Sequence, residues 1–282
     1  NVVPLGYPKK TVITLHDLAI YHHPEWFPQQ IFSTRLLVPQ SLKRAEQIIA
    51  VSQASADDAK ELFSIPAKKI TVIPEAADTA LLPLNDKDQD IDAIYKLPKK
   101  FVLYVGTIEP RKNLPILFQA WEHILRHRPE LLKDTELLLA GGIGYGGKDI
   151  IPQIAKMKLE HSIRHLGYLS HNHKVMLLKR ASAFVFPTLY EGFGLPALEA
   201  LQLGVPVITT NTSSIPEVVG DAALLHDPSD VHGLVEHLEN ILSNPELVQR
   251  LSEAGKKQAS KFSWEKTAKQ TLAVYKRVVK KE

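Results

Sequence analysis

Short apolar runs rich in β-branched residues alternate with helical patterns along almost the whole chain of 282 residues. This alternation restricts the fold more than any other feature. A strand that is apolar at every position is buried on both faces, as in parallel sheets covered by helices. We therefore predict an α/β protein. The predicted strands are 11–15, 48–52, 69–74, 101–107, 136–142, 163–168, 183–188, 205–210 and 223–226; the predicted helices are 33–46, 54–62, 113–126, 171–181, 196–203, 231–243 and 245–282.

The polar stretch 84–100 interrupts the alternation and indicates a linker between two domains. Six predicted strands follow it, enough for a doubly wound sheet, but only three precede it, which leaves unpaired edges and a thin core. We expect an incomplete first domain at 1–97, a second domain at 98–262 and a final helix at 263–282. The chain begins with Asn1, which we interpret as an internal point of a longer protein; a processed terminus is the alternative.

The composition narrows the possible partners and compartments. A formal charge of +3 is too small to indicate a nucleic-acid partner, and the absence of cysteine excludes disulfides and thiolate chemistry. No apolar run reaches the roughly 18 residues that span a bilayer. We expect a cytoplasmic protein. The basic end "KRVVKKE" (276–282) leaves a peripheral contact with the inner membrane face open, although cations also stabilise a helix C-terminus.

The stretch "EGFGLPALEA" (191–200) places Glu191 in a glycine-rich loop and Glu199 in the helix that follows. Pro196 suits the first helical position, so the loop feeds a helix N-terminus, where free N–H groups and the helix dipole attract anions. Two carboxylates beside an anion site suit a nucleotide-sugar, whose diphosphate meets the helix while its hydroxyls meet the acids. The alternative is a loop charge and an acid that stabilises the helix dipole.

Arg111 and Lys112 lie in "GTIEPRKNL" (106–114), at the carboxyl end of the first strand of the second domain. Ligands of open α/β sheets bind at that edge, where two cations could neutralise a leaving diphosphate. The alternative is a solvated pair before a helix. Asn113 is predicted to cap that helix.

These motifs resemble those of a family 4 glycosyltransferase with the GT-B fold, nearest to its mannosyltransferase-like members. The resemblance covers nearly the whole chain. It is carried by "TLHDLAIYHHPEWF" (14–27), "AVSQASADDA" (50–59), "GTIEPRKNL" (106–114), "LGYLS" (166–170), "EGFGLPALEALQLGVPVITTNTSSIPEVVGDAALL" (191–225) and "FSWEKTAKQTLAVYKRV" (262–278).

The resemblance implies two facing Rossmann-like domains, the first lacking its N-terminal part, and a last helix that crosses back onto the first domain. It implies transfer of a hexose with retention of configuration from a nucleotide-diphosphate sugar to a glycan or lipid-linked acceptor. GDP-mannose is our guess for the donor, and a UDP-sugar is the alternative. A missing N-terminal segment or a second chain is left open as a further partner, and this chain alone is expected to transfer poorly.

The resemblance also implies roles for single residues. Glu191 would contact the donor sugar and stabilise the transition state, Lys112 and Arg111 would hold the diphosphate, and His16 would face the sugar across the cleft. The remaining positions would bind the donor through backbone N–H groups, ribose contacts and flanking of the base. They are Gly192, Phe193, Gly194, Leu195, Glu199, Tyr168 and Leu169.

Three features fit less well. The stretch "PEAAD" (74–78) stands where the family usually has an asparagine-glycine turn. "GIGYGG" (142–147) matches a dinucleotide-binding pattern, but no acid follows at the next strand end. "DKDQDID" (86–92) could suggest a metal, but a solvated charge run is the better interpretation. We expect no metal and no cofactor beyond the donor. The alternatives to a transferase are a non-catalytic or fragmentary GT-B binding module and another GT-B enzyme such as a sugar epimerase.

Overall fold

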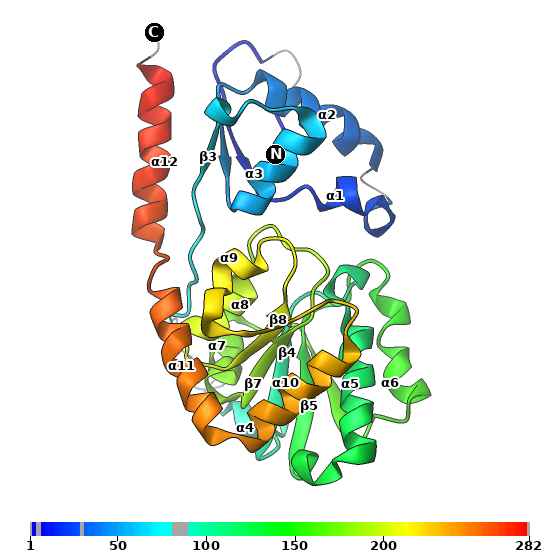
Figure 1. Ribbon diagram of the computed structural model, residues 1–282. Coiled ribbons are helices and arrows are strands. Elements are labelled where there is room, and N and C mark those ends of the chain that lie inside the picture. Colours follow the sequence, from blue (N-terminus) through cyan, green and yellow to red (C-terminus); the bar gives the residue numbers. More distant parts are fainter. Residues whose placement is uncertain (1, 4–6, 29–30, 81–89, 281–282) are drawn as a thin grey trace.

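The computed structural model describes residues 2–3, 7–28, 31–80 and 90–280. Figure 1 shows two α/β domains, one above the other, with the chain ending beside the upper one. All strand pairs of both sheets are parallel, as the apolar strands predict.

The smaller domain is built on a three-stranded sheet of order β1-β2-β3. Leu15 pairs with Ala50, and Ala50 with Val72. Its helices and strands, in chain order, are β1 (Val12–Leu15), α1 (Ala19–His22), α2 (Ile31–Arg44), β2 (Gln47–Ala50), α3 (Gln53–Phe63) and β3 (Ile70–Val72).

The larger domain has a six-stranded sheet of order β6-β5-β4-β7-β8-β9, with helices on both faces (Figure 1). Its α-helices and strands are α4 (Ile91–Tyr95), β4 (Lys100–Val105), α5 (Leu114–His127), β5 (Thr135–Ala140), α6 (Pro152–Lys156), β6 (Ile163–Gly167), α7 (His171–Arg180), β7 (Ala183–Phe186), α8 (Leu195–Gln202), β8 (Val207–Thr210), α9 (Ile215–Val219), β9 (Leu224–His226), α10 (Val231–Ser243) and α11 (Pro245–Ala259). This larger sheet is doubly wound, whereas the three strands of the smaller sheet follow one another without a reversal. The α/β class with parallel sheets is confirmed.

Several helices begin where a side chain caps the first turn. The oxygen of Ser52, Ser170, Asp230, Asn244 or Ser263 accepts a hydrogen bond from a backbone N–H three residues later. Such caps satisfy donors that a helix start leaves unpaired. Ser263 caps the start of the last helix, α12 (Trp264–Val279), so the helical region predicted over 245–282 consists of two helices, α11 and α12, with a break at 260–263.

The stretch 84–100 is more structured at its end than the linker prediction allowed. Ile91 of α4 is buried in the core of the larger domain, and Tyr95 hydrogen-bonds His173 of α7 over 2.7 Å. Asp92 forms an ion pair with Arg180. Helix α4 therefore packs with the larger domain, before the expected boundary at 97.

Helix α12 runs beside the smaller sheet (Figure 1). Val274 is fully buried against Ile49 and Ile73, and the Thr267 hydroxyl donates to the carbonyl of Pro74 over 2.7 Å. The chain therefore joins the domains at two places, at the linker and at the step from α11 to α12.

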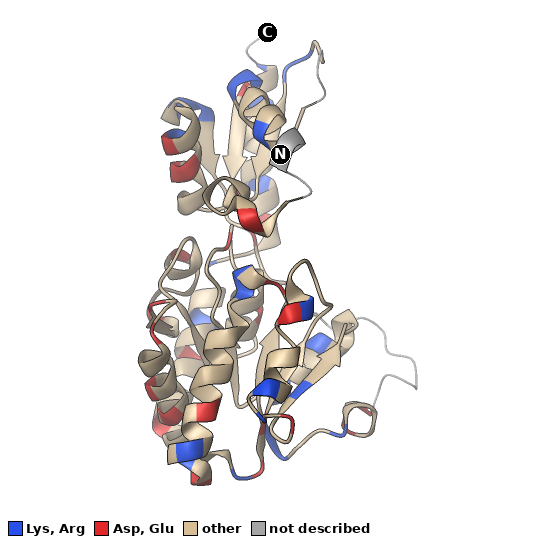
Figure 2. Ribbon diagram, turned by 90° about the vertical axis from the view of Figure 1, so that its right-hand side faces the viewer, with Lys and Arg blue, Asp and Glu red and all other residues tan. Residues whose placement is uncertain are grey.

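Acidic and basic residues are interspersed over both domains (Figure 2). In the part of the chain that the structure describes, no helix combines the length and the apolarity that a membrane crossing requires.

Candidate active site

The larger sheet reverses its winding between β4 and β7, its two central strands. From β4 the chain proceeds to β5 and β6 on one side, and from β7 to β8 and β9 on the other. In open α/β sheets the loops after two such strands lead to opposite sides, and the crevice at this point is the usual ligand site. The loop after β4 carries Arg111 and Lys112, and the loop after β7 carries Glu191.

The structure brings these three charges into contact. Lys112 Nζ lies 2.5 Å from Glu191 Oε1, and Arg111 Nη1 lies 3.0 Å from Glu191 Oε2. The Thr188 hydroxyl donates to Glu191 Oε1 over 2.7 Å. The side chains of Lys112 and Glu191 are 7% and 10% exposed, so this is a buried ion cluster. The alternative of a solvated cation pair is wrong, because both cations are turned inward.

Burial and charge act against each other on both partners. Burial would raise the pKa of the Glu191 carboxyl, but the charges of Lys112 and Arg111 outweigh it and hold that pKa below its ordinary value. Burial lowers the pKa of the Lys112 ammonium, and the Glu191 charge offsets part of that effect. Glu191 is therefore ionised at neutral pH, and its charge supports the protonated form of Lys112.

Arg111 has further partners that fix its orientation. Its guanidinium donates to Glu109 Oε1 over 2.9 Å and to the carbonyl of Tyr190 over 2.9 Å. Burial would lower the Arg111 pKa, but the carboxylates of Glu191 and Glu109 raise it above the ordinary value. Arg111 thus cross-links the two loops of the crevice.

The loop from Glu191 leads into the N-terminus of α8. Gly194 is the residue before the helix, with φ of +105°, a conformation that favours glycine. No side chain of the described residues caps this end, which leaves its N–H groups for a ligand. Phe193 is buried against Phe262 with ring centroids 5.8 Å apart, and Leu195 is the first helical residue. Phe193 therefore anchors the loop by its side chain, which leaves its backbone at the crevice.

Glu199 was predicted to lie in the first turn of this helix, and its observed position differs. It is the fifth residue of α8, beyond the first turn, and its carboxylate Oε1 lies 2.5 Å from Lys174 Nζ of α7. The predicted capping by Asn113 is wrong. Asn113 has φ of +55°, which does not suit a side-chain cap, and its amide donates to the carbonyl of Pro228 over 2.9 Å.

A cavity of about 330 Å³ lies at the carboxyl ends of β4, β5 and β6. It is lined by backbone of Gly106 and Gly141, by Tyr168 and Leu169, and by Lys174. Tyr168 is 85% exposed and Leu169 is buried. An apolar cavity edged by an exposed ring and a lysine–carboxylate pair suits a nucleoside, whose base has flat faces and whose ribose carries hydroxyls.

The smaller domain meets the Glu191 loop at Gly192. A Cβ atom placed on Gly192 would lie 2.0 Å from the carbonyl oxygen of His16 and 2.9 Å from Cβ of Asp17. The Ser55 hydroxyl donates to that His16 carbonyl over 3.0 Å and to the Gly192 carbonyl over 3.4 Å. Only a residue without a side chain permits this approach between the domains.

Other contacts across the domains surround this point. Glu217 of α9 accepts from the N–H groups of Gln53 and Ala54 over 2.8 and 3.0 Å, at the start of α3. The Tyr190 hydroxyl donates to Asp58, and burial and this bond raise the Tyr190 pKa above its ordinary value. The two domains are therefore in direct contact around Gly192.

His16 follows β1 and its ring is 59% exposed, with Nδ1 lying 3.3 Å from Glu75 Oε1. The hydrogen bond from Glu75 raises the His16 pKa above its ordinary value of 6.5, against an opposing effect of burial. Glu75 belongs to "PEAAD", the stretch that departs from the family pattern. The departure thus supplies a carboxylate partner for a residue predicted to face the donor sugar.

We expect Glu75→Gln to lower the His16 pKa, because an amide cannot supply the negative charge that stabilises the imidazolium. NMR titration of the histidine ring protons measures this change. The stability that the pair contributes is present below pH 6.5 and is lost as pH rises through the raised pKa. The variant should therefore lose stability at pH 5 and little at pH 8. An unchanged His16 titration would contradict the assigned pair.

The sequence analysis missed Thr188, Lys174 and Glu75. Each reaches its partner across the fold or around a turn, and no local spacing signals the pairing. "GIGYGG" has a packing role instead of a dinucleotide role, since a Cβ on Gly147 would lie 2.0 Å from the Ile108 carbonyl oxygen. Residues 86–89 of the acidic run lie outside the described residues.

Two α/β domains with parallel sheets, the larger one doubly wound, meet at the loop that carries the charged cluster, and this arrangement is that of the GT-B class of glycosyltransferases. The chain belongs to the family described as glycosyl transferases group 1, whose model matches residues 86–258, and a second model, glycosyltransferase family 4, matches residues 3–81.

The O-antigen chain mannosyltransferase B of Escherichia coli is 34% identical over 271 residues, which are 95% of this chain and 70% of that protein. The serotype-specific mannosyltransferase WbdA of Escherichia coli is 30% identical over 93% of this chain, which spans only 32% of WbdA.

Solved structures share the fold. Sucrose-phosphate synthase from Thermosynechococcus elongatus superposes with a TM-score of 0.81 at 23% identity, covering 98% of this chain and 70% of that one. Anabaena Alr3699/HepE, solved with UDP and glucose, gives a TM-score of 0.79 at 21% identity, covering 95% and 72%.

Proposed function

We propose that this protein transfers a hexose, mannose from GDP-mannose, to a hydroxyl of a glycan or lipid-linked acceptor, with retention of configuration and without a metal. The observation that carries the proposal is the buried cluster of Lys112, Arg111 and Glu191 beside the open N-terminus of α8. The choice of mannose rests on the 34% identity to a named mannosyltransferase. The proposal includes a cytoplasmic location, supported by the absence of cysteine.

The donor would lie with its nucleoside in the smaller cavity and its sugar toward Glu191. Its nucleoside fits the cavity beside Tyr168 and Leu169, with the ribose hydroxyls toward Glu199 and Lys174. Its diphosphate would then reach the N–H groups at the start of α8, where the helix dipole stabilises negative charge. The sugar would extend to Glu191, between the domains.

The reaction breaks the bond between the anomeric carbon and the diphosphate oxygen, which keeps the electron pair. The acceptor hydroxyl oxygen forms the new bond to that carbon, and its proton passes to the departing diphosphate. Lys112 and Arg111 would stabilise the negative charge that grows on the leaving group, and Glu191 the positive charge that grows on the sugar. These fixed charges supply what a metal would otherwise supply.

Nucleotide binding tests the proposal. We expect GDP to bind the protein more tightly than UDP, as measured by calorimetry. Glu199→Ala should weaken binding by about 1.5–3 kcal/mol, because hydrogen bonds to a charged group are lost. Glu253→Ala, an exposed acid of α11, is the matched control and should leave the affinity unchanged. Melting temperatures of both variants are measured, because Glu199→Ala also leaves Lys174 without its carboxylate.

Two results would contradict parts of this proposal. If neither GDP nor UDP binds the chain, the nucleotide-sugar donor is wrong. If UDP binds and GDP does not, the transferase proposal holds and the choice of GDP-mannose fails.

A further inference from the structure

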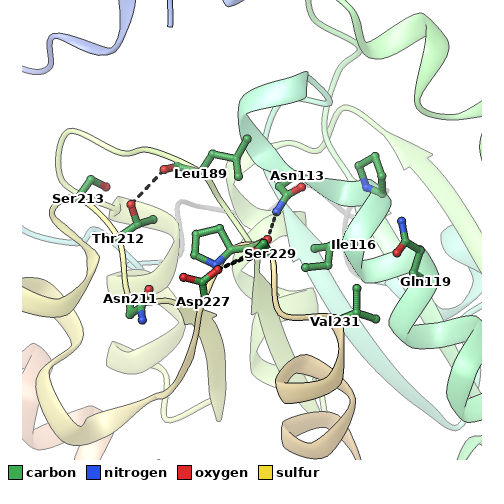
Figure 3. A pocket seen from close by; sticks show the side chains of 12 residues that line it. Asn113, Ile116, Gln119, Leu189, Asn211, Thr212, Ser213, Asp227, Ser229 and Val231 are labelled. Atoms are coloured by element: carbon green, nitrogen blue, oxygen red, sulfur yellow. Dashed lines mark hydrogen bonds between the residues drawn. The ribbon is translucent and has the colours of Figure 1, made fainter. Parts of the chain in front are cut away.

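A second and larger cavity, of about 790 Å³, lies between the start of α5 and the loops after β8 and β9 (Figure 3). It sits at the carboxyl ends of β8 and β9, whereas the nucleoside cavity sits at those of β4, β5 and β6. The larger cavity is lined by none of the residues that are predicted or proposed to bind the donor.

Two walls of different origin form this cavity. One wall is the start of α5, where Ile116 and Gln119 lie three residues apart on one helix face and Asn113 stands just before the helix (Figure 3). The other consists of the loops after β8 and β9, with Asn211 and Asp227 (Figure 3). Amide and carboxylate side chains thus flank the cavity on both sides.

Several of these polar groups are available to a ligand. The side-chain amides of Gln119 and Asn211 have no hydrogen-bond partner among the described residues, and both residues are exposed. The Asp227 carboxylate accepts from the N–H and hydroxyl of Ser229 at a single oxygen, Oδ1, over 2.8 and 2.5 Å. Its other oxygen is left for a donor. Amides offer both donors and acceptors, which suits a ligand rich in hydroxyl groups.

The charge of the cavity disfavours a ligand that carries phosphate groups. Among the described residues that line it, Asp227 is the only ionisable one, and its hydrogen bonds to Ser229 hold its pKa below the ordinary value. A carboxylate that no cation of the lining neutralises repels phosphate and diphosphate. Ile116, Leu189 and Val231 add apolar surface, against which the C–H faces of a sugar ring can pack.

The cavity also touches the loop that carries Glu191. Leu189 and Ser213 line it, the Thr212 hydroxyl donates to the carbonyl of Leu189 over 3.2 Å, and the Glu191 N–H donates to the hydroxyl of Ser213 over 2.9 Å. The lining of the cavity is therefore in direct contact with the backbone of Glu191.

We propose that this cavity is a binding site for an uncharged oligosaccharide, namely a segment of the acceptor glycan, held by Gln119, Asn211 and Asp227. The proposal rests on the glycosyltransferase function proposed above, and it specifies the acceptor as a glycan bound by the larger domain as well as by the smaller one.

Linear α-linked mannotriose serves as the probe, titrated into the full chain with and without saturating GDP and followed by saturation-transfer NMR and calorimetry. We expect the double variant Gln119→Ala/Asn211→Ala to raise the mannotriose Kd about tenfold, the effect of losing two ordinary hydrogen bonds. The matched control is Gln249→Ala/Asn240→Ala, which removes two exposed helical amides elsewhere in the same domain. It should leave the Kd unchanged.

The nucleotide measurements separate this proposal from the proposed function. The double variant should bind GDP as the unaltered protein does. Three results would each overturn the glycan site: the double variant binds mannotriose as tightly as the unaltered protein does, no mannotriose binding is detected at all, or pyrophosphate displaces mannotriose. If the unaltered chain binds neither GDP nor UDP, the proposed nucleotide-sugar donor is wrong instead.

Discussion

Glu191→Gln is expected to lower kcat by about 10²–10³-fold, while the Kd for the nucleotide changes far less. Glutamine keeps the shape of the side chain but removes the charge that lies 2.5 Å from Lys112 and 3.0 Å from Arg111. The charge on the sugar develops only in the transition state, so its stabilisation appears in the rate and not in ground-state binding. Steady-state kinetics with GDP-mannose, together with calorimetry, measures both quantities on the protein with any natural N-terminal segment included.

The matched control is Glu109→Gln, which removes a second carboxylate from Arg111 but none from Lys112. Its effect on kcat should be at least tenfold smaller than that of Glu191→Gln. Equal losses in the two variants would show that Glu191 acts only by orienting Arg111. A loss of nucleotide affinity as large as the loss of rate would contradict the transition-state role.

The same variant has a consequence for pH dependence. Burial already lowers the Lys112 pKa, and the Glu191 charge opposes that effect. Without this charge the pKa should fall further, so the loss of activity on the alkaline side should begin at a lower pH in Glu191→Gln. The variant also leaves the buried Lys112 without its carboxylate, while Arg111 keeps Glu109. A melting curve will show a stability loss of several kcal/mol unless a bound diphosphate replaces the charge.

The sequence predicted the strands well and the short helices badly. Each predicted strand overlaps an observed one, because a strand buried on both faces must be apolar throughout and is easily distinguished from its surroundings. Helix α4 was missed because it has only five residues, too few to show a helical period, and follows a run of charged residues. Helices α6 and α9 have five residues each, too few to show a helical period.

The sequence predicted which loops form the site, but it did not predict which side chains contact each other there. Glu191, Lys112 and Arg111 were predicted from their positions at strand ends, which the parallel topology brings to one edge. The contact between Glu199 and Lys174 joins residues of two different helices, and only the packing of α7 beside α8 determines it. The left-handed backbone of Asn113 is likewise invisible in a sequence, since asparagine adopts either conformation.

Gly192→Ala is expected to abolish most of the activity without unfolding either domain. The new Cβ would lie 2.0 Å from the His16 carbonyl oxygen, so the loop and the smaller domain must separate by more than an ångström. Gly192 does not have a positive φ, so alanine introduces no backbone strain of its own. The domains can relieve the clash by opening at the linker and at the α11–α12 step. A misplacement of this size costs about 10²-fold in rate, because His16 and Glu191 no longer face the same sugar.

Ser55→Ala separates the loss of contact from the steric clash. It removes the hydroxyl that bonds the His16 and Gly192 carbonyls across the domains but adds no atom, so it should reduce kcat by less than tenfold. Small-angle scattering should show a larger radius of gyration for Gly192→Ala than for Ser55→Ala, while GDP still binds to the larger domain of both. Full activity of Gly192→Ala would mean that the closed contact at His16 is not part of the catalytic state. A collapse of its melting temperature would mean instead that the domains cannot separate, and that this glycine serves stability before catalysis.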